Sequence, residues 1–205
     1  ELTDSRVGTT RHLVRAFAES PRKPSVFIQA SAIGYYGPRS DEELTEADSA
    51  GGGFLAELCQ AWEAEAQRAE PFGVRVVRLR IGIVLARDGG ALAKMAPPFR
   101  AWVGGPLGHG RQWMSWVHRD DLIGIVHWAL GASQVSGAVN ATAPGPVRMR
   151  EFAATLGRVL RRPSWAPVPA VILRLMLGEA AEILLTGQRV IPQAALAGGY
   201  RFLYP

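Results

Sequence analysis

Cysteine is almost absent from this sequence, because Cys59 is the only one in 205 residues. A single cysteine excludes a disulfide bond within the chain, so packing and hydrogen bonds must hold the fold together. The apolar neighbours Leu58 and Trp62 indicate that the Cys59 thiol lies in a core. We therefore expect a reducing, cytoplasmic setting for the protein.

Long apolar runs are lacking as well. The most apolar stretch, residues 168–185, contains Arg174 and Glu182 and is therefore a poor membrane span. We expect this stretch to form two buried helices instead, and we expect no membrane partner. The overall composition is that of a globular protein, with 48% apolar and 20% charged residues, which is sufficient for a core.

Concentrated positive charge is missing too, although the net charge is +5. The only dense basic cluster, Arg158, Arg161 and Arg162, lies at the end of a predicted helix, where the helix dipole favours cations. Nucleic-acid binding typically uses a basic stripe interleaved with aromatic residues, so we expect no nucleic-acid partner. A phosphate-bearing cofactor is a sufficient use for the excess positive charge.

The pattern that is present alternates between helix and strand periodicity. Helical spacing of apolar residues covers 5–19, 54–70, 92–99 and 150–160, and short strand-like runs cover 25–31, 74–79, 81–85 and 138–142. A further helix is predicted to be capped by Asp120 or Asp121 and to end at Gly131. Such alternation predicts an α/β fold around a parallel sheet, and the more irregular part after Arg87 predicts a substrate lobe.

Three segments carry chemical signals. The first, SAIGYYG at residues 31–37, follows an apolar strand, and ligands of open α/β sheets bind beyond the carboxyl ends of the strands. The second is the glycine loop GHGRQ at 108–112 with WVHRDDL at 116–122, in which glycines allow close approach of backbone to a ligand. The third is GQRVIP at 187–192 with GYRF at 199–202, together with glycine-rich stretches at 89–92 and 104–108.

Together these segments resemble the extended short-chain dehydrogenase/reductases, in particular an NAD(P)-dependent epimerase-like subfamily with a characteristic small C-terminal domain. The resemblance implies the C-terminal part of a Rossmann-type, doubly wound parallel sheet with a smaller C-terminal α/β substrate lobe. It divides the chain into a partial NAD(P)-binding domain at residues 1–145 and a substrate domain at 146–205. It also implies NADP(H) rather than NAD(H) and a small-molecule substrate, and it leaves open a homodimer formed through exposed helices.

Members of this family open with a strand, a Gly-x-x-Gly-x-x-Gly turn and a helix, whose backbone N–H groups hold the cofactor pyrophosphate. This sequence shows no such turn and starts at Glu1 rather than at a methionine. We therefore expect that the N-terminal Rossmann half, on the order of 80 residues, is missing. We also expect the small C-terminal domain to be truncated at its end.

For catalysis, the resemblance points to hydroxyl groups at the end of the first strand. Ser31, Tyr35 and Tyr36 are the candidates to polarise the reacting oxygen. The family usually relies on a Tyr-x-x-x-Lys pair on the next helix, in which the lysine lowers the pKa of the tyrosine. Two alternative alignments place Phe54 and Leu58, or Leu55 and Cys59, at these positions. Neither alignment supplies the pair.

For binding, the resemblance implies contacts near the helix entry, the strand ends and the glycine loop. The candidate cofactor contacts are Glu1, Arg6, Ser31 and Val84. Arg6 would meet the phosphates and Val84 the nicotinamide, although Arg6 is equally consistent with a solvated charge at a helix end. Gln112 and His118 are the candidate substrate contacts, and His118 is also consistent with a structural role beside a helix cap.

Two functions therefore remain open. One is an NADP(H)-dependent oxidoreductase or epimerase acting on a small polar substrate, which the glycine loop and Gln112 favour. The other is a catalytically silent dinucleotide-binding sensor or interaction protein, which the absent Tyr-x-x-x-Lys pair favours. A serine hydrolase using Ser31 or Ser115 with His118 lacks the Gly-x-Ser-x-Gly elbow. The four histidines show no metal-binding spacing, so we expect no metal.

Overall fold

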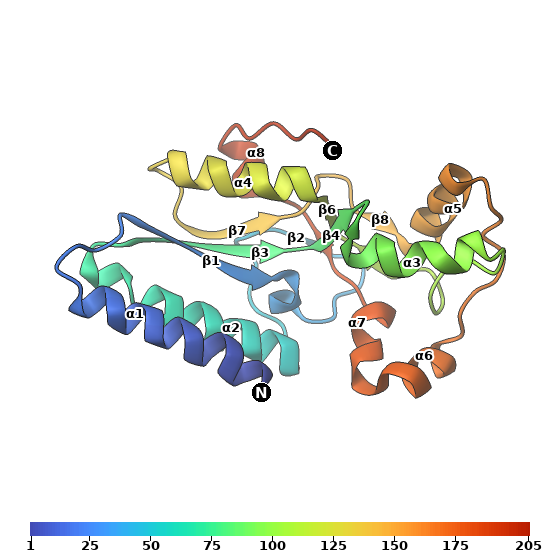
Figure 1. Ribbon diagram of the computed structural model, residues 1–205, viewed down its shortest axis with the longest axis horizontal. Coiled ribbons are helices and arrows are strands. Elements are labelled where there is room, and N and C mark those ends of the chain that lie inside the picture. The colour runs from blue at the N-terminus through green and yellow to red at the C-terminus, as the bar shows by residue number, and fades with distance from the viewer.

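The computed structural model describes residues 1–205, except the side chains of Leu177, Glu179, Ala180 and Ile183. A three-stranded parallel sheet lies at its centre (Figure 1). The strands β1 (Val26–Ala32), β3 (Arg75–Ile81) and β7 (Gly137–Ala141) stand in the order β1-β3-β7. The parallel sheet that the helix and strand alternation predicts is therefore confirmed, and β1 is one of its two edges.

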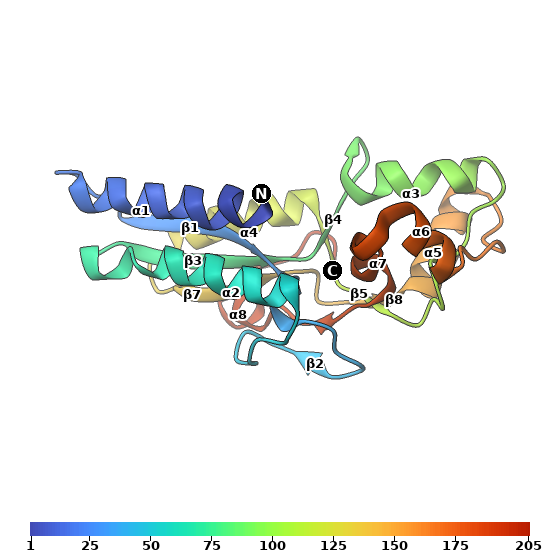
Figure 2. The same cartoon turned by 90° about the horizontal axis from the view of Figure 1, so that it is seen from below.

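Helices cover both faces of this sheet. The helices α1 (Thr9–Glu19), continued from a π-helical turn at Asp4–Gly8, and α2 (Phe54–Gln67) pack on one face, and α4 (Arg119–Gly131) and α8 (Gln193–Ala197) on the other (Figures 1 and 2). Successive residues of β3 point to opposite faces, so Val76 packs with Val14 beneath the sheet and Val77 packs with Ile125 above it. Burial on both faces explains why apolar residues of this strand point to either side, although Arg75, Arg78 and Arg80 interrupt its apolar sequence.

A second group of elements lies beyond the carboxyl ends of the sheet strands (Figure 1). It contains the helices α3 (Gly90–Arg100), α5 (Met149–Leu160), α6 (Ala170–Leu177) and α7 (Glu182–Leu185), and the antiparallel pair β5 (Trp113–Met114) and β8 (Val147–Arg148). The parallel pair β4 (Ile83–Ala86) and β6 (Trp116–His118) connects this group to the sheet. It corresponds to the predicted substrate lobe.

The end of the chain returns from this lobe to the sheet. Strand β9 (Arg189–Val190) pairs in parallel with β2 (Glu43–Leu44), and α8 then packs beside β7. Helix α3 precedes residue 145 and α5 follows it, yet side chains of both lie in one cluster around Met114. Because elements from both sides of residue 145 pack together, the predicted division into 1–145 and 146–205 stays a proposal.

Two local expectations are wrong. The N-cap of α4 is His118, whose Nδ1 accepts a hydrogen bond from the Asp120 N–H at 3.2 Å, whereas Asp120 and Asp121 lie inside the first turn. The predicted burial of the helix at 170–177 also fails, because Leu175 and Met176 are 85% and 74% exposed. Hydropathy alone does not say whether a neighbour covers a helix face.

No helix in the described part of the chain is long and apolar enough to cross a membrane.

A buried carboxylate fastens the C-terminal segment to α4. Asp121 is fully buried and accepts hydrogen bonds from the Leu203 N–H at 2.8 Å, the Tyr204 N–H at 2.9 Å and the Tyr200 hydroxyl at 3.1 Å. Gly124, one turn later on α4, makes room for the tyrosine, since a Cβ there would lie 2.2 Å from the Tyr200 oxygen. The absence of one side chain thus allows another to reach the carboxylate.

We expect the substitution Asp121→Ala to lower the free energy of unfolding by about 3 kcal/mol, because it removes a fully buried acceptor of three hydrogen bonds. The matched control is Asp120→Ala, which removes a half-exposed carboxylate from the same turn and should cost less than about 1 kcal/mol. Urea unfolding followed by circular dichroism measures both values. Equal losses in the two variants would contradict a specific role for Asp121.

Candidate functional site

A buried polar network lies where β1 and β3 end side by side. Ser31 on β1 is the direct neighbour of Arg80 on β3, and Glu63 of α2 lies beneath them. All three side chains are at most 3% exposed. Groups of this kind are stable in a core only when their hydrogen bonds are made.

Glu63 is the centre of the network. Its carboxylate accepts two hydrogen bonds from the Arg80 guanidinium, both at 3.0 Å, one from the Ser31 hydroxyl at 2.7 Å, and one from Arg78 at 3.3 Å. Burial lowers the pKa of Arg80, but the hydrogen bonds and the charge of Glu63 outweigh it and raise the pKa above its ordinary value. The Arg80 guanidinium is therefore charged at neutral pH.

Tyr36 closes the network from the following turn η2 (Ile33–Tyr36). Its hydroxyl accepts a hydrogen bond from Arg80 at 3.0 Å. The same hydroxyl has two acceptors for its proton, Asn140 Oδ1 at 2.7 Å and the Thr45 carbonyl oxygen at 2.9 Å. Burial raises the pKa of Tyr36 to about 12. The phenol is therefore neutral at pH 7, and its proton is held by oxygens of the protein.

Tyr35, the other tyrosine of η2, is only partly buried. The Arg80 guanidinium carbon lies 3.4 Å from the centre of its ring, a cation–π contact. The hydroxyl of Tyr35 has no hydrogen-bond partner within the described residues. Among the three predicted catalytic residues, the structure thus brings all three together around Arg80 and Glu63, but it leaves only the Tyr35 hydroxyl uncommitted.

Glycines allow the turn η2 to pack closely against the loop that precedes α2. Gly37 has a φ of +62°, and a Cβ at Gly51 would lie 2.0 Å from the Tyr36 carbonyl oxygen. A hydrogen bond of 3.0 Å from the Gly51 N–H to the Tyr35 carbonyl joins the two loops. The two tyrosines are therefore held by backbone contacts that admit no larger residue.

The start of α2 shows what stands in place of the usual Tyr-x-x-x-Lys pair. A Cβ at Gly34 would lie 3.5 Å from Leu55 Cβ and 4.0 Å from Cys59 Sγ. Of the two alternative alignments, the one with Leu55 and Cys59 therefore faces the strand-end turn. Burial raises the pKa of the Cys59 thiol, so this position offers neither a phenol nor a cation.

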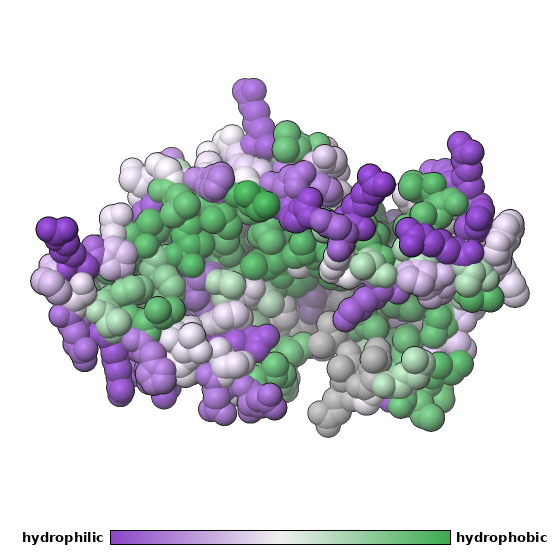
Figure 3. All heavy atoms as spheres, viewed as in Figure 1, coloured by the Kyte–Doolittle hydropathy of each residue, from purple (hydrophilic) through white to green (hydrophobic). Residues whose placement is uncertain are grey.

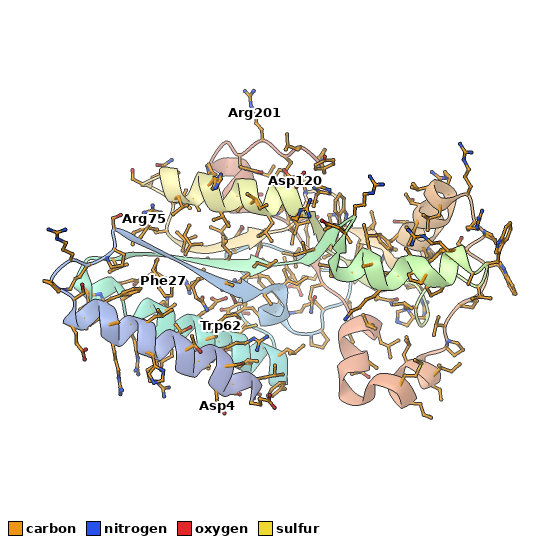
Figure 4. The ribbon with its side chains drawn as sticks, in the orientation of Figure 1. Asp4, Phe27, Trp62, Arg75, Asp120 and Arg201 are labelled. Atoms are coloured by element: carbon orange, nitrogen blue, oxygen red, sulfur yellow. The ribbon has the colours of Figure 1, made fainter. Side chains whose placement is uncertain are left out.

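The predicted cofactor contacts lie at different places. Arg6 donates a hydrogen bond to Ser5 at 3.1 Å and lies 5.6 Å from the ring of Trp62, a residue on α2 (Figure 4). No carboxylate of a described side chain pairs with Arg6. Glu1 is exposed at the chain start, and Val84 is partly buried on β4. Ser31, the fourth, belongs to the Glu63 network.

A cavity of about 520 Å³ opens between the sheet and the second lobe. Its walls are the loop at 38–41, the glycine loop at 109–113, the start of α5 and residues 185–187. Gln112, a predicted substrate contact, lines this cavity. His118, the other, does not line it, because it caps α4 and its ring lies 3.8 Å from that of Tyr204.

The alternative chemistries find no matching geometry. Ser115 is buried, donates to the Gln188 carbonyl at 2.7 Å and accepts from the Val190 N–H at 2.9 Å, so it is occupied by backbone. Neither Ser31 nor Ser115 hydrogen bonds to a histidine in the described part of the chain. Within those same residues, no three His, Cys, Asp or Glu side chains gather as a metal site would require.

Two parts of the site were not predicted as site residues from the sequence, namely the network arginines and the arginines around the cavity. Arg78 and Arg80 lie two positions apart in an apolar strand and share one face, a pattern that indicates a buried acidic partner. That signal could have been used. Arg148 reaches the cavity through the pairing of β5 with β8, which local patterns do not reveal.

We expect Glu63→Gln to lower the free energy of unfolding by about 4 kcal/mol, because it leaves the Arg80 guanidinium buried without a counter-charge. Glu57→Gln is the matched control, since Glu57 is exposed on the same helix and should change stability by less than about 0.5 kcal/mol. Equilibrium unfolding in urea gives both values. A loss below about 1 kcal/mol for Glu63→Gln would show that the network is not structural.

Two known protein families match most of this chain. The sequence profile of the NAD dependent epimerase/dehydratase family matches residues 1–141, and that of a domain of unknown function (DUF1731) matches residues 168–205. The expectation that the N-terminal Rossmann half is missing is not borne out by the first match, which begins at residue 1.

Individual relatives agree with these matches. The Epimerase family protein SDR39U1 homolog, chloroplastic, of Arabidopsis thaliana is 45% identical over the whole chain, which spans 59% of the length of that relative. The expected cytoplasmic setting stays a prediction, since that relative is named chloroplastic. YfhF, an epimerase family protein of Bacillus subtilis, is 40% identical over 99% of the chain and 67% of its own length.

A solved structure extends the likeness to three dimensions. The human epimerase family protein SDR39U1 (isoform 2), crystallised with NADPH, superposes with a TM-score of 0.95 over 99% of this chain and 69% of its own, at 38% identity. The predicted Rossmann-type α/β fold is thereby confirmed. Because the family profile covers more than half of the residues, the chain belongs to the NAD dependent epimerase/dehydratase family.

Proposed function

We propose that this chain forms part of an NADP(H)-dependent oxidoreductase or epimerase that acts on a small polar substrate. The observation that carries the proposal is the superposition, at a TM-score of 0.95, on a human relative crystallised with NADPH. The chain spans less than two thirds of the plant relative, so the proposal concerns the whole protein to which these residues contribute.

The donor set at the start of the chain fits a phosphate group of such a cofactor. The Arg6 guanidinium has no carboxylate partner among the described side chains and lies over Trp62, which restricts its position. We assign Arg6 to a cofactor phosphate and keep Val84 as the apolar contact of the nicotinamide and Glu1 as a neighbouring polar contact. NADP(H) would supply or accept the hydride of the reaction.

The chain's own residues divide the remaining tasks. Tyr35 is the proposed proton donor and acceptor, because its hydroxyl has no partner among the described residues and the Arg80 guanidinium over its ring holds the side chain in place. Ser31 and Tyr36 are positioning residues, since their hydroxyls are committed within the Glu63 network. The cavity that Gln112 lines is the proposed substrate site.

One observation favours the alternative, a catalytically silent dinucleotide-binding sensor. Leu55 and Cys59 face η2, the turn where the usual tyrosine and lysine would act, and neither side chain supplies a phenol or a cation there. Under this alternative the protein would bind NADPH but transfer no hydride. Binding and turnover are therefore measured separately.

We expect the full-length protein to bind NADPH, which a change in NADPH fluorescence would show. We also expect it to oxidise NADPH when one of a panel of small carbonyl compounds is supplied as substrate. Tyr35→Phe should lower turnover about 100-fold while leaving NADPH affinity unchanged. Tyr200→Phe is the matched control, because the Tyr200 hydroxyl hydrogen-bonds only to Asp121 among the described residues, and its loss should leave turnover intact. NADPH binding with no oxidation of any compound would favour the sensor.

A further inference from the structure

Positive charge gathers at the cavity between the two lobes. Arg39, Arg111, Arg148 and Arg150 line it, and among the lining residues that the structure describes the only carboxylate is Asp41. The net charge of these described lining residues is therefore positive. A cleft lined by one sign of charge concentrates ligands of the opposite sign.

Two of these arginines are already paired. Arg148 donates to Asp41, which also accepts from the indole N–H of Trp113 at 3.0 Å, and these bonds hold the pKa of Asp41 below its ordinary value. Arg39 pairs with Glu42 at 3.1 Å. These pairs build the wall of the cavity, and the Arg148 guanidinium carbon lies 3.9 Å from the centre of the Trp113 ring.

The other two arginines are free. Arg111 and Arg150 are exposed, and neither pairs with a carboxylate among the side chains that the structure describes. They are neighbours because the glycine loop docks on the start of α5, where the Arg150 N–H donates to the Gly110 carbonyl at 2.9 Å. Gly110 has a φ of +69°, and a Cβ there would lie 3.2 Å from Arg150 Cβ, so the close approach requires glycine.

Gln112 supplies an independent sign of a ligand. Its side chain is only 7% exposed, and its amide nitrogen donates to the carbonyls of Leu107 and Leu184, both at 2.9 Å. The two carbonyls use both amide hydrogens and thereby fix the orientation of the group. Its oxygen Oε1 has no donor within the described residues. A buried acceptor without a partner costs free energy, which a ligand that donates a hydrogen bond would recover.

We propose that this cavity binds a small hydroxylated anion, whose anionic group is held by Arg111 and Arg150 and whose hydroxyl donates to Gln112 Oε1. This inference rests on the proposed enzymatic function, because it names the substrate class of that site. A volume of about 520 Å³ falls in the usual range for small-molecule sites. Phosphate and carboxylate share the required charge, and the test below separates them.

The first experiment uses isothermal calorimetry on the full-length protein at constant ionic strength. Glucose 6-phosphate and gluconate carry both charge and hydroxyls, glucose carries hydroxyls alone, and inorganic phosphate and acetate carry charge alone. We expect at least one of the first two to bind at least tenfold more tightly than glucose, phosphate or acetate. The tighter of the two identifies the anionic group. Equal affinity for all five compounds would overturn the proposal.

The second experiment tests the two free arginines. The double variant Arg111→Gln and Arg150→Gln should weaken binding of the preferred anion at least tenfold. The control, Arg158→Gln with Arg201→Gln, removes the same charge from exposed positions that do not line the cavity, and Arg201 projects outward from the C-terminal segment (Figure 4). An equal loss in both double variants would show a general charge effect and contradict the site.

Calorimetry needs no turnover, so the two proposals can fail separately. If the protein oxidises NADPH but none of the hydroxylated anions binds, the anion site is wrong and the proposed function stands. If an anion binds through Arg111 and Arg150 but NADPH does not bind, the cavity is confirmed as an anion site and the NADP(H)-dependent function is wrong.

Discussion

The contact between Glu63 and Arg80 is the interaction on which the rest of this site depends. A bidentate arginine–carboxylate pair withdrawn from water is stable only when its remaining hydrogen-bonding groups also find partners. Ser31, Arg78 and Tyr36 supply them. Because these groups come from β1, β3 and η2 and Glu63 comes from α2, the pair fixes the sheet, the turn and the helix relative to one another.

The turn that carries Tyr35 is positioned from two sides. Arg80 lies over the tyrosine ring from the direction of the sheet, and the backbone of Gly51 touches the turn from the direction of α2. A hydroxyl that is held in this way can act with little reorganisation, which is what catalytic groups require. The same rigidity would also serve a protein that only binds a dinucleotide, so rigidity by itself does not separate the two functions.

The fold was largely readable from the sequence, whereas the site was readable only in part. Buried parallel strands leave mainly apolar runs, and these marked β1, β3 and β7 without knowledge of any neighbour, although Arg78 and Arg80 interrupt the run of β3. The cap of α4 was misassigned because an imidazole nitrogen can accept the same N–H as a carboxylate. The exposure of α6 and the cluster of cavity arginines depend on which distant segments meet. The local periodicity of a sequence carries no information about such contacts between distant segments.

Within these 205 residues one edge of β1 is unpaired, and this has a consequence for how they associate. On the side away from β3, no described strand pairs with β1, and apolar side chains gather over this region between α1 and α4 (Figure 3). Free strand edges are templates for pairing between molecules, and proteins counter this hazard with charges and prolines. The segment that leads into β1, with Pro21, Arg22, Lys23 and Pro24, supplies both kinds of gatekeeper and thereby disfavours aggregation at this edge.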